Sequence, residues 1–442
     1  MFRFNDSMPV TFHDELPDAV DVVVIGGGVI GISTAWYLRE QGLSVLVCDK
    51  GRVAGEQSSR NWGWVRVTVR DPAEVPIAQE SLRCWDEISQ CIDDDTGFTR
   101  QGILLLAETE RDMADCEEWM KTAGEHGVDT QLLSASQAAE HIDGLQGGWR
   151  GGIVTPSDAR AEPFKAVPAI ARGLQKRGGL IREDCAVRTL DVQAGAVTGV
   201  VTEAGTVKAH TVVCAAGAWS NQFLANHGIR FPQLTLRGTV VRTAAAPEIY
   251  PGAAGFKDVF VRRRQDGGYT VASEWFDHTI AANSFRYFFD FLPTLASGSH
   301  IGLRVGRDVT QRGFIDRRWD GADVSPFEAD RVRNPTPSEA GLRKIRDHLA
   351  RRVPQLADVE FAEAWAGMID ATPDVVPVLD SIGSHPGLFL ASGFSGHGFG
   401  IGPGAGKVMA NLVTGRPTGF DLERFRFSRF SDGSKIRPGP AI

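Results

Sequence analysis

The stretch "DVVVIGGGVIGISTAWYLREQGLSVLVCD", residues 21–49, constrains the fold of this chain more than any other. The apolar run Val22–Ile25 is typical of a strand buried on both faces. Three glycines follow it with the spacing G-x-G-x-x-G: Gly26, Gly28 and Gly31. The first permits a tight turn, the second lets a phosphate approach the backbone, and the third lets the next helix pack closely on the strand. We expect that helix over residues 29–41, with its N-terminal amides facing the phosphates.

An acidic residue completes this dinucleotide-binding pattern. "LSVLVCD" reads as the next strand and ends at Asp49, 23 residues after Gly26 (49 − 26), where a carboxylate accepts hydrogen bonds from a ribose. Asp49 would repel the 2′-phosphate of NADP, so the pattern favours FAD or NAD. Lys50, which follows the acid, is counted with the cofactor-binding residues.

Length and charge exclude several classes of protein. A chain of 442 residues exceeds one ordinary core, so two or three domain-sized units are expected. The formal charge of −8 argues against a nucleic-acid surface. No apolar run reaches the ~20 residues that span a bilayer, and the first twenty residues lack a signal-peptide pattern, so we expect a cytoplasmic enzyme. The six cysteines are scattered without a C-x-x-C pair, which predicts free thiols and no metal site.

Three separated segments look like parts of one nucleotide-binding sheet. "HTVVCAAGAWS", residues 210–220, predicts a strand that ends in small residues. "LFLASGFSGHGFGIGPGAGKVMANLVTG", residues 388–415, predicts a strand, a glycine-rich turn and a helix from about Gly404. The polar, then aromatic, then basic stretch "SSRNWGWVRVTVRDP", residues 58–72, does not continue as a further βαβ unit, as it would in a typical NAD enzyme.

With these segments the chain resembles the D-amino-acid oxidase superfamily of FAD-dependent oxidoreductases. The branch of glycine and sarcosine oxidases, D-amino-acid dehydrogenases and opine oxidoreductases is the most similar. The resemblance rests on GGGVIG with its acid, "AAGAWS", "TPD-x-x-P-V" (residues 372–378) and "GFSGHGFGIGP", and covers residues 21–415. It implies an α/β fold, with a Rossmann-like FAD-binding domain and a second α+β substrate domain built on an antiparallel sheet.

The resemblance also implies a discontinuous domain organisation. Residues 1–85, 152–235 and 365–425 would form the FAD-binding domain. Residues 86–151 and 236–364 would form the substrate domain. The basic, Pro/Gly-rich tail, residues 426–442, would be a flexible or docking end.

The resemblance assigns cofactor contacts residue by residue. The pyrophosphate would face Gly26, Gly28 and Gly31, and the adenosine would meet Asp49 and the backbone of Val187. The polar segment along the flavin and pyrophosphate would contain Ser58, Ser59 and Asn61, with Trp62 beside it. Further cofactor contacts would come from Ala216, Gly217 and Trp219. The loop beside the isoalloxazine would contain Gly393, Ser395, Gly396, His397 and Gly398.

Two departures from the family bear on the chemistry. Gly367 stands where some members carry the cysteine that binds FAD covalently, so we expect non-covalent FAD. Gly400 stands where sarcosine-type oxidases carry a lysine for the substrate carboxylate. Their second lysine, which promotes reaction with oxygen, has no counterpart in residues 266–273, and nearby Lys257 is not assigned to that role. Carboxylate binding must therefore differ, and a dehydrogenase becomes an alternative to an oxidase.

Arginines are the candidates for binding a substrate carboxylate, because a guanidinium matches it bidentately. The candidates are Arg66, Arg70 and Arg237; the alternative for the first two is a surface arginine at a strand end. Trp62 and Trp64 would wall the pocket or pack in the core. "VRRRQ", residues 261–265, is interpreted as a solvated strand end. "NSFRYFFDFLP", residues 283–293, is interpreted as an amphipathic helix with its aromatic residues in the core.

Two residues are candidate catalytic groups. His397 would sit at the flavin edge or tune the ring electrostatically, because its glycine neighbours argue against an apolar core. Asp370 would bind a second cationic group of the substrate or accept the amine proton; the alternative is a turn or cap acid. Asp374 suits a structural turn acid.

These expectations describe an FAD-dependent oxidoreductase that oxidises the C–N bond of an amino acid or N-substituted amino acid, opine-like amines included, to an imine by hydride transfer. Alternatives are a D-amino-acid dehydrogenase or oxidase, the flavin-bearing subunit of a multi-subunit dehydrogenase, and a non-catalytic flavoprotein. A 2-hydroxy acid substrate is disfavoured. The electron acceptor would be oxygen or another carrier.

Overall fold

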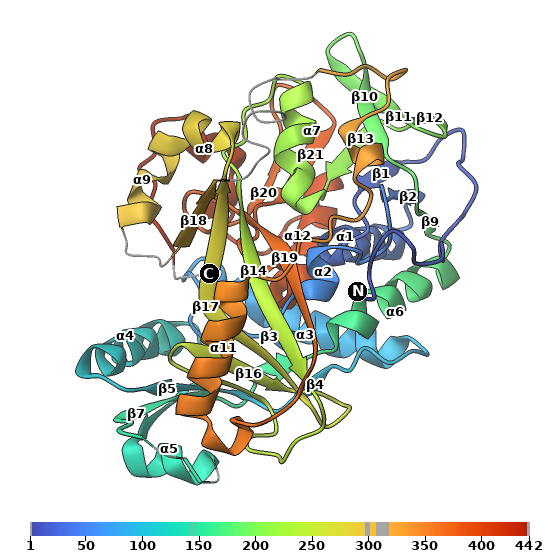
Figure 1. The fold of residues 1–442 in the computed structure, drawn as a ribbon. Helices are drawn as coiled ribbons and strands as arrows, with labels where there is room; N and C mark the ends of the chain where they lie inside the picture. Colours follow the sequence, from blue (N-terminus) through green and yellow to red (C-terminus); the bar gives the residue numbers. More distant parts are fainter. Residues whose placement is uncertain (1, 143, 146, 297–300, 306–317, 440–442) are drawn as a thin grey trace.

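The computed structural model describes residues 2–142, 144–145, 147–296, 301–305 and 318–439, which form two sheets with their helices (Figure 1). The first sheet has six strands in the order β20-β21-β13-β1-β2-β9. Their bounds are Val378–Ser381, Leu388–Ser392, Thr211–Cys214, Val22–Ile25, Val45–Cys48 and Leu180–Arg182. All neighbours in this sheet are parallel except β20 and β21.

Both faces of this sheet are covered, as the unbroken apolar run of β1 predicts. Val22 and Val24 belong to the core under four helices, whereas Val23 and Ile25 belong to the core under a small sheet. The helices are α1 (Val29–Glu40), α3 (Val75–Cys91), α6 (Pro163–Lys176) and α12 (Gly398–Val413). The small sheet consists of β10 (Val187–Gln193), β11 (Ala196–Thr202) and β12 (Gly205–Lys208), with α7 (Ser220–Asn226) beside it.

The second sheet runs in the order β19-β14-β17-β16-β15-β5-β7-β6, with β18 beside β17. The bounds of β19, β14, β17, β16 and β15 are Phe361–Ala371, Leu234–Thr243, Tyr269–Ile280, Val259–Arg263 and Ala253–Phe256. Those of β5, β7, β6 and β18 are Ile103–Ala107, Gly151–Thr155, Gln131–Ser134 and Ile301–Val305. Its neighbours are antiparallel except the pairs β15–β5 and β17–β18. This arrangement confirms the predicted α/β fold class with a second, largely antiparallel sheet.

The remaining elements surround the second sheet and join the two parts. They are α4 (Glu110–Glu125), α5 (Ala135–His141), α8 (Ala282–Arg286), α9 (Phe288–Ala296), α10 (Pro326–Ala329) and α11 (Glu339–Arg352). The short helix α2 (Gln57–Arg60) and a sheet of β3 (Trp64–Val65), β8 (Ala159–Arg160) and β4 (Thr99–Arg100) lie at the junction. β7 crosses the predicted domain boundary at 152, and β19 crosses the one at 365.

The last helix starts earlier than the sequence predicted, at Gly398 instead of near Gly404. Pro403 lies inside it, and a proline removes a helix hydrogen bond. Ser81 of α3 compensates: its hydroxyl donates to the Gly400 carbonyl at 2.7 Å and accepts from the Gly404 amide at 3.1 Å. The neighbouring helix therefore supplies bonds that the proline-containing turn lacks.

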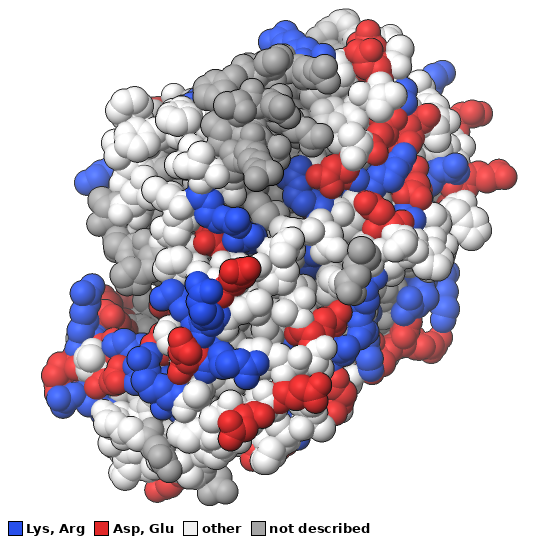
Figure 2. All heavy atoms as spheres, viewed as in Figure 1, with Lys and Arg blue, Asp and Glu red and all other residues white. Residues whose placement is uncertain are grey.

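The interpretation of one basic segment was wrong, and that of one aromatic segment was wrong in part. Arg262 and Arg264 of "VRRRQ" are buried, 2% and 6% exposed, because Glu162 at the start of α6 pairs with Arg262 at 3.0 Å. Residues 283–293, expected to form one amphipathic helix, contain parts of two short helices. Phe285 and Phe289 are 61% and 80% exposed, whereas Tyr287 and Phe291 are buried in the core as expected. Figure 2 shows uncharged atoms over α8 and α9, and acidic and basic side chains interspersed elsewhere on this face.

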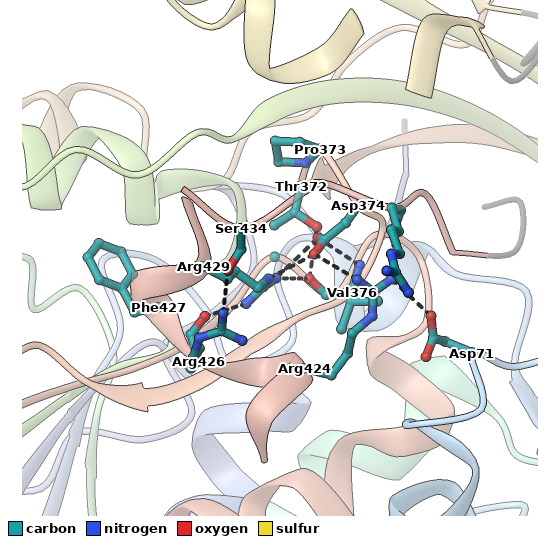
Figure 3. A network of polar contacts seen from close by, with 12 residues as sticks. Asp71, Thr372, Pro373, Asp374, Val376, Arg424, Arg426, Phe427, Arg429 and Ser434 are labelled. Atoms are coloured by element: carbon teal, nitrogen blue, oxygen red, sulfur yellow. Dashed lines mark hydrogen bonds and ion pairs between the residues drawn. The ribbon is translucent and has the colours of Figure 1, made fainter. Parts of the chain in front are cut away.

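Part of the basic tail, residues 427–430, packs against the chain. Its buried Arg429 donates to both carboxylate oxygens of Asp374, at 2.8 and 3.1 Å (Figure 3). Arg424 donates to Asp71 at 3.1 Å. Asp374 is therefore structural, as predicted, and the docking partner of the tail is the turn that contains it.

The structure also bears on the state of the cysteines, on metal binding and on membrane spans. All six cysteines are free thiols, as predicted. Among the described residues, no cluster of His, Cys, Asp and Glu could hold a metal ion. No helix within the described ranges is long and apolar enough to cross a bilayer.

The bridging hydroxyl predicts a stability effect. Replacing Ser81 by Ala leaves the buried Gly400 carbonyl and Gly404 amide with fewer partners, so we expect the free energy of unfolding to fall by about 1–3 kcal/mol. Denaturant unfolding of the purified protein measures this. The exposed Ser384, whose only recorded bond is to the neighbouring His385, supplies the control Ser384→Ala, which should leave stability unchanged. Equal stability of both variants would contradict the bridging role.

Candidate active site

A cleft of about 1220 Å³ opens at the carboxyl ends of β1, β2 and β13, the position where open α/β sheets bind nucleotides. Most of the predicted cofactor residues line it: Gly26, Gly28, Asp49, Lys50, Ser58, Asn61, Val187, Ala216, Gly217, Trp219, Gly396 and Gly398. Asp370 lines it as well. Six predicted cofactor residues are not among its lining: Gly31, Ser59, Trp62, Gly393, Ser395 and His397.

Two glycines of the opening motif allow other backbone atoms to approach them closely. A Cβ on Gly26, whose φ is +110°, would lie 2.5 Å from the Ala215 carbonyl oxygen. A Cβ on Gly31 would lie 1.9 Å from the Gly26 carbonyl oxygen. Gly31 therefore brings α1 onto β1, and this contact aims the helix N-terminus at the cleft. There the Val29 amide donates to the Ser58 hydroxyl at 2.9 Å.

Asp49 is held at the end of β2 by backbone amides. Its two carboxylate oxygens accept from Gly27 and Gly51, each at 2.7 Å. Burial raises the pKa of this carboxyl to about 6 in spite of these bonds. The glycine turn, the helix N-terminus and this acid, which meet along one elongated cleft, fit the pyrophosphate and ribose of FAD.

The other end of the cleft contains Asp370, which is 7% exposed. Its carboxylate accepts from the amides of Gly393 and Phe394, at 2.8 and 3.3 Å, and thereby holds the loop between β21 and α12. Burial raises its pKa to about 6. Asp370 thus lines the cleft and also supports the following loop, the role of a turn or cap acid that was the alternative.

His397 is buried among charges, 2% exposed, and does not reach the cleft lining. Its Nδ1 lies 3.0 Å from the Glu74 carboxylate of the turn before α3, and its Nε2 has no hydrogen-bond partner in the described part of the chain. Burial, with the positive charge of Arg70, lowers the pKa of the imidazole. His397 therefore does not line the cleft, and its role at the flavin edge or in tuning the ring electrostatically stays a prediction.

Arg66, which is half-buried, and Arg70, which is buried, belong to the same cluster, so neither is an exposed surface arginine. Arg66 donates to the Thr68 carbonyl at 2.8 Å, and burial lowers its pKa to about 9. Arg70 is 6% exposed, and within the described residues its Nε and Nη1 have no partner. Val69 between them has φ +54°, a strained conformation for a β-branched residue. Strain and orphaned donors at one place indicate a ligand site.

Arg237 does not join this cluster. It lies on β14 and donates to Asp277 at 2.8 Å and to the Thr336 carbonyl at 3.0 Å, while its Nε has no partner in the described part of the chain. Like Arg66 and Arg70, it lines neither cavity. Its predicted role in carboxylate binding therefore has no support from its position, because Asp277 already supplies its counter-charge.

The two tryptophans pack with an aromatic residue of the second sheet. Trp62 stacks on Phe260 with centroids 5.0 Å apart, and Trp64 meets the same ring edge-on at 5.8 Å. Arg262 donates to the Trp62 carbonyl at 2.6 Å. Both tryptophans are thus held at the junction of the two sheets, next to the Arg66 backbone.

Sequence reasoning missed a second, larger cavity of about 1840 Å³ beyond β19. Leu236, Phe276, Phe288 and Phe291 contribute apolar walls, and Glu274 is its one acidic lining residue among those described. Successive residues at the end of β19 line the two cavities, Asp370 the first and Ala371 the second. Only the pairing of distant strands and α8–α9 creates this space.

The cleft also contains residues that no motif marked. Glu56 and Gln57 immediately precede the polar segment, and their polar side chains next to it could have indicated that they line the cleft. Phe327 and Arg331 belong to a segment far along the chain, and no local sequence pattern predicts that they line this cleft.

Comparison with known proteins identifies the family. The profile described as "DAO: FAD dependent oxidoreductase" matches residues 21–412. The chain belongs to this family. It is thus an FAD-dependent oxidoreductase, and its predicted place in the D-amino-acid oxidase superfamily is confirmed.

The chain is similar over its length to several characterised relatives. The 4-methylaminobutanoate oxidase (formaldehyde-forming) of Paenarthrobacter nicotinovorans is 26% identical over 95% of this chain, which spans only 47% of that protein. The glycine oxidase of Pseudomonas aeruginosa is 24% identical, covering 89% of this chain and 95% of the relative. The sarcosine oxidase subunit beta of an Arthrobacter species is 24% identical, covering 95% and 94%. The structure of L-amino acid deaminase from Proteus myxofaciens in complex with anthranilate superimposes with a TM-score of 0.91, at 29% identity over 96% of each chain.

The raised pKa of Asp370 predicts a pH effect on stability. Because its native pKa, about 6, exceeds the ordinary value of 3.8, the stability that this group contributes is full below the lower value and is lost as pH rises through the higher one. Asp370→Asn stays neutral and keeps an acceptor oxygen, so we expect it to gain roughly 1–3 kcal/mol relative to the wild type across this range. Thermal unfolding against pH measures the gain. The exposed Asp421→Asn should follow the wild type, and parallel curves for Asp370→Asn would contradict the assignment.

Proposed function

We propose that this oxidoreductase oxidises the C–N bond of an amino acid or N-substituted amino acid that carries a large apolar group. The observation that carries the proposal is buried Arg70, whose Nε and Nη1 have no partner among the described residues, next to half-buried Arg66. A carboxylate is the ligand that satisfies such donors bidentately. Bound FAD supplies the hydride acceptor.

The position of Gly400 supports a rebuilt carboxylate site. A Cβ there would lie 3.1 Å from the Trp64 carbonyl oxygen and 3.3 Å from the Arg66 amide, so any side chain at this position would crowd the backbone of residues 64–66. Arg66 and Arg70 are the cations next to this place. We assign the carboxylate to this pair, with Arg66 as the more accessible member.

The second cavity supports a large substituent on the substrate. Its walls are mainly leucine and phenylalanine, and burial of apolar surface contributes ~0.8 kcal/mol per methylene. The relatives are named for amino acids or their N-methyl derivatives, and the deaminase structure contains an aromatic carboxylate. The apolar group sits on Cα or on the amine nitrogen, as in the N-substituted, opine-like substrates that the sequence favoured.

The protein's own groups in this proposal bind and orient. Arg66 and Arg70 fix the carboxylate, Trp62 and Trp64 exclude water, and Asp370 holds the loop beside the reacting centre. Substrates lose hydride only when the C–H bond is held close to the acceptor, which makes this positioning the main contribution of the chain. FAD is bound non-covalently in this proposal, because Gly367 has no side chain that could link to the flavin.

The electron acceptor we propose is a carrier other than oxygen. Lys257 pairs with Asp112 at 2.9 Å, and Lys50 is the one lysine among the described residues that line the cleft. Transfer through a partner subunit is the second candidate, favoured by the similarity to the sarcosine oxidase subunit. A cytoplasmic location stays a prediction.

The reaction is tested by anaerobic bleaching of the flavin with a panel of D- and L-amino acids, N-alkyl amino acids, opines and 2-hydroxy acids. We expect bleaching by amino or N-alkyl amino acids, with an affinity that rises about fourfold per added methylene. Glycine is the small control. Air or a quinone dye is then added, and faster return of colour with the dye supports the proposed acceptor. Bleaching by 2-hydroxy acids alone, or by none of the panel, would overturn the proposal.

Carboxylate binding by Arg66 is tested with substrate pairs. For each bleaching amino acid we compare the same amine without its carboxylate. The wild type should prefer the acid, and Arg66→Gln should lose roughly 10- to 100-fold of that preference. Arg66→Lys should recover part of it, and Arg237→Gln should keep it in full. An unchanged preference in Arg66→Gln would remove the arginine from the site.

A further inference from the structure

Residues 319–333 form a segment of the substrate-domain chain that crosses the nucleotide end of the cleft; we call it the latch. Phe327 and Arg331 of the latch line the same cleft as the glycine motif. A Cβ on Gly51, just after the ribose-binding acid, would lie 2.2 Å from the Arg331 carbonyl oxygen. The latch therefore lies in direct backbone contact with the end of β2.

Lys50 is the first anchor of the latch. Its ammonium donates to the carbonyls of Asp330 and Arg331 at 2.7 and 2.8 Å and pairs with Glu56 at 2.7 Å. Arg331 returns a bond to the Lys50 carbonyl at 2.9 Å. It also pairs with both oxygens of Glu203, at 2.8 and 2.6 Å.

Trp219 is the second anchor. The Lys50 ammonium lies 4.1 Å and the Arg333 guanidinium carbon 4.0 Å from its ring centroid, the geometry of cation–π contacts. The indole N–H donates to both oxygens of Glu56, at 3.0 and 3.1 Å, and Glu56 also accepts the Arg333 amide at 3.1 Å. Phe327 meets the same indole edge-on at 5.9 Å.

Glu56 connects the two anchors. Burial opposes its ionisation, yet Lys50 and Arg333 hold its pKa below the ordinary value, so it stays charged. An unpaired carboxylate in a cleft for an anionic pyrophosphate would repel the ligand. Lys50 pairs with this carboxylate, and the Trp219 indole and the Arg333 amide donate hydrogen bonds to it, so its charge joins the cleft to the latch.

We propose that the latch is a wall of the FAD site, and that Glu56, Lys50, Trp219 and Arg333 keep FAD bound by holding the latch closed. FAD then enters and leaves only when the latch lifts. These residues act on cofactor exchange and not on substrate chemistry. The inference needs only FAD binding and is independent of the substrate proposed above.

The rate of FAD release tests the latch directly. Holoenzyme is diluted into buffer without FAD, and the rise in fluorescence of the released FAD is followed over time. Glu56→Gln and Arg333→Ala should each release FAD about tenfold faster, the equivalent of one or two cation–π or charged contacts. Arg346→Ala is the control, because it removes a matched cation–π contact away from the latch: the guanidinium carbon of Arg346 on α11 lies 4.0 Å from the ring centroid of Phe361 on β19. This variant should release FAD like the wild type.

A second measurement keeps the test decisive if Glu56→Gln fails to fold. Trypsin cleavage after Arg331 and Arg333 is compared in the holoenzyme and in protein stripped of FAD. We expect FAD to slow cleavage at both sites, and Arg333→Ala to show reduced protection at Arg331. The proposal would be overturned if Arg333→Ala released FAD at the wild-type rate, or if FAD did not change the rate of trypsin cleavage. It would also be overturned if Arg346→Ala accelerated FAD release as much as Arg333→Ala.

Discussion

The approach of Gly31 to the carbonyl of Gly26 is the contact on which the rest of the site depends. Because a Cβ at Gly31 would lie 1.9 Å from that oxygen, only glycine lets α1 rest on the turn after β1. The helix N-terminus is thereby aimed into the cleft, with its dipole and free amides available to a phosphate. Asp49 on the adjacent strand then meets the same space, and the cleft continues toward Asp370.

A second constraint is the burial of charge at the junction of the two sheets. Glu162 pairs with Arg262, which in turn bonds to the Trp62 carbonyl, so a buried ion pair positions the aromatic segment. Buried ion pairs add little net stability, but loss of one partner leaves a costly unpaired charge. The same physics makes the orphaned donors of Arg70 informative, because a fold seldom leaves buried N–H groups without a ligand.

Local patterns predicted most of the nucleotide end of the site. Strand β1, helix α1 and the acid Asp49 were found where the sequence placed them, because turn geometry and close packing act over a few residues. The start of α12 was predicted late, and Ser81, which compensates for Pro403 inside the helix, lies on another helix where no local pattern indicates it. His397 was expected beside the flavin, whereas a carboxylate from the turn before α3 draws it into a buried cluster.

The sequence by itself determined the family, the FAD-binding sheet and the residue types of the cleft, because each depends on short-range spacing. The tertiary structure alone decided which arginine is orphaned, where the apolar cavity lies and which distant segment closes the cleft. Arg70 and Arg237 are both carboxylate-binding candidates by sequence, but Asp277 pairs with Arg237, whereas two N–H groups of Arg70 have no partner among the described residues. Burial and counter-charge arise from pairings between remote strands, and no local pattern encodes them.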